Sequence, residues 1–168
     1  MQINKEDVAF VVTSLFYKGG IGVLKEIQVN KTKEMVYAMD EDSNVIARFP
    51  CSKAFVDGEN SAGQAFDNAE DGTYEEGSEG DTEIMYPNNL TEDNIPYGWA
   101  YINIDARGRA LHGGGSGLAD PFAPYQDALL PTHGCFRMYN ADVFWLAQAK
   151  KRSEATGIDV VITVVEDN

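Results

Sequence analysis

Hydrophobic and polar residues alternate over three short stretches that begin shortly after residue 22. They cover 23–29, 35–39 and 44–49, and polar turns rich in Asn, Asp, Lys and Ser separate them. A period of two places successive side chains on opposite faces, as in a half-buried β-strand. The pattern therefore predicts a meander of three short strands.

Two later stretches, 99–105 and 158–164, alternate in the same way, and each predicts one more strand. Between them, 141–155 has the ends expected of a helix. Asn140 can act as its N-cap, and Gly157 can end it in the left-handed conformation.

A second helix is predicted at the N-terminus, over residues 4–17. Asn4 can cap it, and the glycines at 19–20 can end it. Its β-branched residues count against a helix, because they lose side-chain freedom there. We describe residues 1–20 as an N-terminal helical extension.

Regular periodicity is absent from 52–97, which predicts an acidic loop region. Much of the negative charge lies in 67–83, with room for a short strand at 72–74. Residues 106–131 form a Gly- and Pro-rich connection. No repeat or boundary divides the 168 residues, so we expect a single, mainly β domain covering 1–168.

The acidic composition limits the classes of partner. Lys and Arg total 13 and Asp and Glu total 27, which gives a formal charge of −14. This balance argues against binding to nucleic acid and to anionic lipid. The apolar run at 8–16 is shorter than the roughly 20 residues of a membrane span. No signal peptide is visible, since Glu6 and Asp7 stand where cationic residues are expected.

The two cysteines lie in different surroundings. Cys51 follows the apolar stretch 45–49 and is interpreted as a buried thiol at the end of a strand. A bridge between Cys51 and Cys135 is possible, but nothing in the sequence requires one.

Reactive side chains gather around Cys135. His112 and His133 are the two histidines of the chain, and both lie within 23 residues upstream of this cysteine. The thiolate is the attacking form of a cysteine, so a catalytic thiol needs a base nearby. His133 and Cys135 share a face of an extended segment, and Gly134 between them offers backbone N–H groups to an oxyanion. The cluster therefore indicates acyl transfer.

Other interpretations of this cluster remain open. The GGGSG run after His112 lacks the Lys-Ser/Thr of a phosphate loop. The two histidines and Cys135 supply three zinc ligands without a CxxC pair. Another class of cysteine hydrolase and a non-enzymatic acidic binding module are further alternatives. Papain-like and NlpC-type peptidases, however, usually place the cysteine before the histidine.

The segment Thr132-His133-Gly134-Cys135-Phe136-Arg137-Met138 resembles the signature of the L,D-transpeptidase catalytic domain, the YkuD-type family. The resemblance extends more weakly over 22–166, with Leu111-His112-Gly113 similar to the end of the family's His-Gly strand. It implies a β-sandwich or rolled sheets, with one helix after the nucleophile.

The resemblance also implies a role for each motif residue. Cys135 would be the nucleophile, His112 its proton acceptor and donor, and His133 a second histidine beside the substrate. The backbone N–H groups of Gly134 and Cys135 would hold the oxyanion, and Arg137 would hold a substrate carboxylate. The other substrate-binding residues by this resemblance are Gly113 and Thr132.

The implied reaction is L,D-transpeptidation of peptidoglycan stem peptides without a cofactor, which forms crosslinks or exchanges the terminal D-amino acid. An L,D-carboxypeptidase acting as an antibacterial effector or a phage cell-wall enzyme is the alternative. The expected site of action is the cell envelope or periplasm, by an unknown export route. Arg107, Arg109 and Arg137 are expected to offset the negative charge near an anionic substrate.

Overall fold

The computed structural model describes residues 23–75 and 82–167, so the helix expected over 4–17 lies outside the described residues. The three alternating stretches form the antiparallel meander β1 (Glu26–Asn30), β2 (Met35–Met39) and β3 (Val45–Ser52). The other elements are β4 (Gly72–Tyr74), β5 (Glu83–Ile84), the 3₁₀ turn η1 (Glu92–Asn94), β6 (Ala100–Asn103), β7 (Ala110–His112), β8 (Phe136–Met138), α2 (Asn140–Ala155) and β9 (Val161–Val165).

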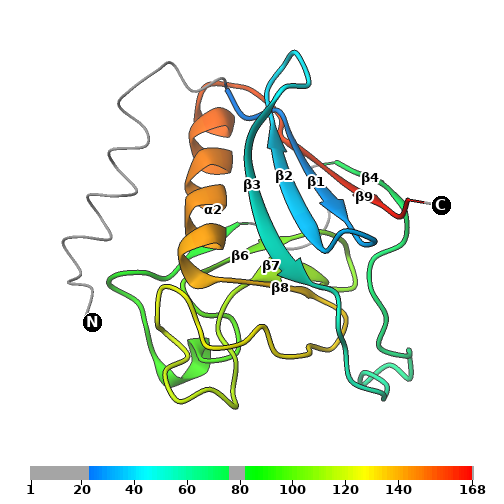
Figure 1. Ribbon diagram of the computed structural model, residues 1–168, viewed down its shortest axis with the longest axis vertical. Helices are drawn as coiled ribbons and strands as arrows, with labels where there is room; N and C mark the ends of the chain where they lie inside the picture. The colour runs from blue at the N-terminus through cyan, green and yellow to red at the C-terminus, as the bar shows by residue number, and fades with distance from the viewer. Residues whose placement is uncertain (1–22, 76–81, 168) are drawn as a thin grey trace.

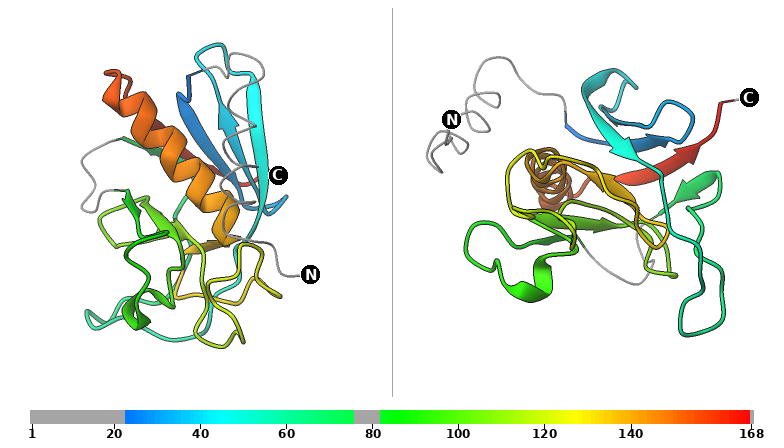
Figure 2. Two further views of the ribbon diagram at one scale, coloured as in Figure 1. Left: turned by 90° about the vertical axis from the view of Figure 1, so that its left-hand side faces the viewer. Right: turned by 60° about the horizontal axis from the view of Figure 1, so that its bottom comes forward.

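One curled sheet contains every strand of the described residues, in the order β4-β9-β1-β2-β3-β8-β7-β6-β5. Strand β3 joins the two halves, since most of it pairs with β2 while Cys51 and Ser52 pair with β8. Helix α2 lies against the curled sheet (Figures 1 and 2). The mainly β fold of rolled sheets with one helix after the cysteine motif is thus confirmed.

The strands that carry the motif are short and buried on both faces. β7 and β8 each have three residues, all of them buried, and they pair in parallel. A strand covered on both sides shows no alternation of polar and apolar positions, which explains why the pattern did not reveal these two strands. The short strand allowed at 72–74 is confirmed as β4, which pairs with β9.

Apolar side chains from both halves of the sheet and from α2 form the main core. The largest fully buried members are Ile27, Val29, Val36, Ile102, Ile104, Leu111, Phe136, Met138, Val143, Leu146 and Val164. Burying each such side chain contributes about 1.5–3 kcal/mol. Leu111 anchors β7 in this core, and Phe136 and Met138 anchor β8. The two strands that carry the motif are therefore held rigidly. No helix in the described part of the chain is long and apolar enough to cross a membrane.

Asn140 has a different role from the predicted N-cap. The cap position belongs to Tyr139, and Asn140 is the first helical residue, with its side chain fully buried. Its Oδ1 accepts hydrogen bonds from the backbone N–H groups of Trp99 and Gly114, at 3.1 and 3.0 Å. Its Nδ2 donates to two carbonyls of the 113–131 loop, at 2.9 and 2.7 Å. The amide therefore links the helix, the β6 entry and this loop. The end of α2 at Gly157, with φ of +84°, is as predicted.

Replacing Asn140 with Ala should destabilise the fold strongly. The change leaves four backbone groups without their partner, and each buried unpaired group costs about 1–3 kcal/mol. We expect the free energy of unfolding to fall by about 3 kcal/mol or more, measured by urea denaturation. The matched change Asn44→Ala, in the exposed turn before β3, should cost far less; equal losses would contradict the assigned role.

Candidate active site

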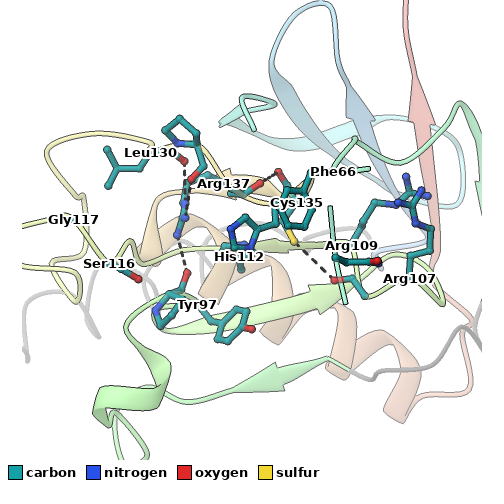
Figure 3. Close-up of a pocket in the computed structure, with 16 residues that line it drawn as sticks. Phe66, Tyr97, Arg107, Arg109, His112, Ser116, Gly117, Leu130, Cys135 and Arg137 are labelled. Carbon is teal, nitrogen blue, oxygen red and sulfur yellow. Dashed lines mark hydrogen bonds between the residues drawn. The ribbon is translucent and has the colours of Figure 1, made fainter. Parts of the chain in front are cut away.

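Five of the seven predicted site residues line one cavity of about 510 Å³: His112, Thr132, His133, Cys135 and Arg137. Figure 3 shows this cavity, with His112 and Cys135 at its centre. Gly113 and Gly134 are buried and do not line it. The structure therefore brings the reactive side chains of the motif together, and these two glycines lie outside the lining.

Cys135 lies just before β8, beside the turn that leads into β7. Its Sγ accepts a hydrogen bond from the Ala110 N–H at 3.4 Å and contacts the Gly108 carbonyl oxygen at 3.8 Å. Burial raises the pKa of the Cys135 thiol above its ordinary value, and the Ala110 N–H offsets only part of this effect. The resting sulfur is therefore a thiol rather than the thiolate that attacks.

His112 ends β7 and is 3% exposed. Its Nδ1 lies 2.9 Å from the Gly113 carbonyl oxygen. Because a carbonyl only accepts hydrogen bonds, Nδ1 carries the ring proton, and Nε2 keeps a lone pair. Burial, helped by the charge of Arg137, lowers the pKa of His112 to about 4. The imidazole is thus a neutral base at pH 7.

The parallel pairing of β7 with β8 sets the positions of the reactive groups. His112 lies opposite Arg137 in the register, and Leu111 lies opposite Phe136. Continuing one residue back places Ala110 opposite Cys135, in agreement with the contact from the Ala110 N–H to Sγ. Since every second residue of a strand shares a face, His112 and Arg137 point to the same side as Cys135.

Arg137 is a buried cation held by neutral oxygens. Its side chain is 5% exposed, and its guanidinium donates to the carbonyls of Pro96 and Gly113 at 2.7 Å each and to that of Leu130 at 3.2 Å. Among the described residues, no carboxylate forms an ion pair with it. Burial accordingly lowers the pKa of Arg137. A buried guanidinium without a counter-ion favours the binding of an anion in the cavity that it lines.

Thr132 stabilises the loop that carries Cys135. Its hydroxyl accepts a hydrogen bond from the Gly134 N–H at 3.0 Å and donates to the Cys135 carbonyl at 2.7 Å. The Gly134 N–H is therefore engaged, contrary to the expectation that it was free for an oxyanion. Gly134 has φ of +115°, and a Cβ there would lie 2.2 Å from the carbonyl oxygen of Asp67, so only glycine fits.

His133 lies at the exposed edge of the cavity and stacks on Phe66, with ring centroids 4.4 Å apart and planes 15° apart. Phe66 belongs to a loop that reaches the motif because Phe55 forms a β-bridge with Thr132. Sequence reasoning missed Phe66, since its loop has no periodicity. It also missed Tyr97, which lines the cavity and contacts the His112 ring edge-on at 5.5 Å.

The expected arginines also reach the cavity. Arg107 and Arg109 line it together with Arg137. Arg109 pairs with Asp105 and Asp67, and Arg107 pairs with Asp67. No group of three or more His, Cys, Asp or Glu side chains that could hold a metal ion is found in 23–75 and 82–167.

Comparisons with known proteins show the family of this chain. The family model of the L,D-transpeptidase catalytic domain, YkuD, matches residues 24–162. The chain therefore belongs to this family, as the motif resemblance predicted, and is an L,D-transpeptidase-type enzyme with a function in peptidoglycan. The comparison with curated proteins gave no match.

Three solved structures are similar at low sequence identity. An L,D-transpeptidase from Xylanimonas cellulosilytica DSM 15894 is 15% identical with a TM-score of 0.49, and the match covers 97% of this chain and 71% of that one. An L,D-transpeptidase from Stackebrandtia nassauensis is 15% identical with a TM-score of 0.44, and the match covers 94% of this chain and 66% of that one. The helical cell shape determining protein Pgp2 from Campylobacter jejuni is 16% identical with a TM-score of 0.43, and the match covers 96% of this chain and 55% of that one.

The buried imidazole makes stability depend on pH. In the unfolded chain His112 gains a proton near pH 6.5, whereas in the folded protein its pKa is about 4. The free energy of unfolding should therefore fall as the pH is lowered from 6.5 towards 4, by up to about 3 kcal/mol from this residue. Urea denaturation of the wild type and of His112→Gln at several pH values measures the difference.

The effect of His112 is the difference between the free energies of unfolding of the wild type and of His112→Gln at each pH. The difference is needed because Asp142 changes the free energy of unfolding with pH in the opposite direction. Burial raises the pKa of Asp142 to about 6, so its contribution favours the folded state at low pH and is lost as the pH rises. That contribution cancels between wild type and His112→Gln. Parallel pH profiles for the two proteins would contradict a buried neutral imidazole.

Alkylation should distinguish the two cysteines. Cys51 is 5% exposed, and burial raises its pKa to about 12. We expect iodoacetamide to modify Cys135 first in the folded protein, with a rate that increases up to a pH above the ordinary thiol pKa. Peptide mass spectrometry of wild type, Cys51→Ala and Cys135→Ala measures both sites. If the alkylation rate of Cys135 reached half its maximum at a lower pH than that of a cysteine-containing peptide, the resting sulfur would be a thiolate instead.

Proposed function

We propose that this protein catalyses cysteine-dependent acyl transfer on peptidoglycan stem peptides, as an L,D-transpeptidase that forms crosslinks or exchanges the terminal D-amino acid. One observation carries the proposal. Cys135 and a neutral His112 with its proton fixed on Nδ1 face the same cavity. Because the imidazole is unprotonated at pH 7, it can accept the proton of the Cys135 thiol.

The reaction begins with proton transfer from the Cys135 thiol to Nε2 of His112. The sulfur forms a bond to the carbonyl carbon of an L-centred residue, and the carbonyl electrons move to oxygen. The Cys135 N–H serves the resulting oxyanion, since the Gly134 N–H is used by Thr132. His112 then returns the proton to the leaving D-amino acid, and a thioester remains on Cys135.

The thioester is resolved by a second nucleophile. An amine of another stem gives a crosslink, a free D-amino acid gives exchange, and water gives L,D-carboxypeptidase action. In each case His112 accepts a proton from the incoming group and returns it to the sulfur as the acyl–sulfur bond breaks. The product therefore depends on which acceptor reaches the cavity. The proposed place of action is the cell envelope, where peptidoglycan lies.

The other motif residues support this chemistry. Arg137 binds the carboxylate of the leaving D-amino acid, because it is the buried cation without a counter-ion in the described residues. The Gly113 carbonyl fixes the tautomer of His112 and is held in turn by Arg137. Thr132 maintains the nucleophile loop. His133, exposed at the rim and stacked on Phe66, contacts the substrate.

The test uses a synthetic stem tetrapeptide and intact-protein mass spectrometry. The wild type should release the terminal D-residue and form an acyl adduct on Cys135. Cys135→Ala should lose about a thousandfold or more in rate and form no adduct. His112→Gln should lose about a hundredfold or more, because proton transfer is impaired.

Cys51→Ala is the matched control, since it removes the buried thiol and leaves the cavity unchanged. It should retain full activity. Adding a D-amino acid or a second stem distinguishes exchange and crosslinking from hydrolysis by the mass of the product. Release of the D-residue by Cys135→Ala at the wild-type rate would refute the proposal.

A further inference from the structure

One row of cross-strand partners runs from the cavity to the edge of the sheet. The row consists of Glu83 in β5, Tyr101 in β6, His112 in β7 and Arg137 in β8. Residues directly opposite each other on neighbouring strands share a face of the sheet. His112 and Arg137 are buried, whereas Tyr101 is half-buried. Glu83 is exposed on the edge strand, so the row leads from the cavity to the surface.

Tyr97 connects this row to the cavity. Its ring contacts His112 edge-on at 5.5 Å, and its centroid lies 6.0 Å from that of Tyr101, with the planes 55° apart. Tyr97 lines the cavity and is 45% exposed, and Figure 3 shows it beside His112. The two tyrosines therefore form one accessible aromatic surface that begins in the cavity and continues towards the sheet edge.

A carboxylate lies at the outer end of this aromatic surface. The hydroxyl of Tyr101 donates to Glu83 Oε2 at 2.9 Å. A carboxylate has about four acceptor positions, so Glu83 can accept further hydrogen bonds from a ligand. A sugar ring matches such a surface, because its C–H groups pack on the negative face of an aromatic ring and its hydroxyls donate to carboxylate oxygens. The surface therefore has the chemistry of a carbohydrate site.

The distance from the nucleophile agrees with the length of the acyl donor. β6 is two strands from β8, so Tyr101 lies about 10 Å across the sheet from the strand that Cys135 precedes. Release of the terminal residue of a stem tetrapeptide leaves three residues between the attacked carbonyl and the glycan strand, and three extended residues span about 10 Å. The leaving D-residue is assigned to Arg137, which lies on the other side of His112 in the row. The remaining peptide then extends towards Tyr101.

We propose that Tyr97, Tyr101 and Glu83 bind a sugar ring of the glycan strand that carries the acyl donor. The proposal rests on the proposed function and extends its substrate from the stem peptide to the glycan. The two tyrosine rings contact the C–H face of the sugar, and Glu83 accepts a hydrogen bond from one of its hydroxyls. Tyr101 is oriented before the ligand binds, since its hydroxyl is already held by Glu83.

Aromatic faces beside a carboxylate also suit an ammonium group. The amine that accepts the acyl group must reach the carbonyl carbon at Cys135, however, and Tyr101 lies about 10 Å across the sheet from β8. An ammonium group held at Glu83 is therefore too far away to be the attacking amine. The spacing favours the sugar, and an ammonium ligand is one outcome of the test.

The test measures binding to Cys135→Ala, which cannot form the thioester. Calorimetry compares an N-acetylated stem tetrapeptide with the same peptide carrying an N-acetylmuramyl residue in place of the acetyl group. We expect the muramyl peptide to bind about tenfold more tightly. Adding Tyr101→Leu should remove most of this preference and leave the affinity for the acetylated peptide unchanged. Tyr101→Phe, which keeps the ring, should retain most of it. Glu83→Gln, at the exposed edge, should weaken the muramyl peptide alone by about threefold, which tests the site even if Tyr101→Leu fails to fold.

Tyr125→Leu is the matched control. Tyr125 is 59% exposed and forms an edge-on pair with Tyr139 at 5.6 Å, outside the lining of the cavity. It should leave the ratio of the two dissociation constants unchanged.

Equal affinities for the two peptides, equal effects of Tyr101→Leu and Tyr125→Leu, or no binding of the muramyl peptide would overturn the proposal. So would a preference for a free N-terminal amine over the acetyl group that depends on Tyr101, because it would assign the surface to an ammonium group. Release of the D-residue by the wild type tests the acyl transfer separately. Acyl transfer with equal affinities would therefore refute the sugar site alone.

Discussion

The parallel pairing of β7 with β8 is the constraint on which the rest of the site depends. Its register places His112 opposite Arg137 and the Ala110 backbone beside the Cys135 sulfur. His112, Cys135 and Arg137 therefore share one face of two strands whose other side chains, such as Leu111 and Phe136, lie in the core. A shift of one residue would turn the side chains of one strand to the other face, so His112 would no longer share a face with Cys135 and Arg137. The pairing of Cys51 and Ser52 of β3 with β8 extends this constraint into the other half of the sheet.

The electrostatics of the cavity follow from burial more than from pairing. Desolvation lowers the pKa of His112 and raises that of Cys135, so both groups are neutral in the resting protein. In the proposed reaction, Cys135 becomes charged only as its proton moves to His112. The positive charge of Arg137 supports the same state of His112, because a second cation beside it would be unfavourable. The resting site thus avoids an ion pair between His112 and Cys135.

The sequence predicted the fold class and several elements, and it missed others for physical reasons. Local patterns were sufficient for β1, β2, β3 and α2, because each has a periodic buried face or clear ends. They were insufficient for β7 and β8, which are short and covered on both faces. The role of Asn140 was missed because its partners, Trp99 and Gly114, are brought to it only by the tertiary fold. Phe66 was missed for the same reason, since its loop reaches His133 through the bridge between Phe55 and Thr132.

The position of Cys51 also affects the redox chemistry of the protein. Cys51 lies opposite Met138, so Cys135 is displaced from it by three residues along the strand, or about 10 Å. This separation exceeds the Cα distance of about 7 Å within which two cysteines can be bridged. Both cysteines are free. A disulfide between Cys51 and Cys135 is therefore excluded in this fold, so an oxidant can reach the Cys135 sulfur only by entering the cavity from outside.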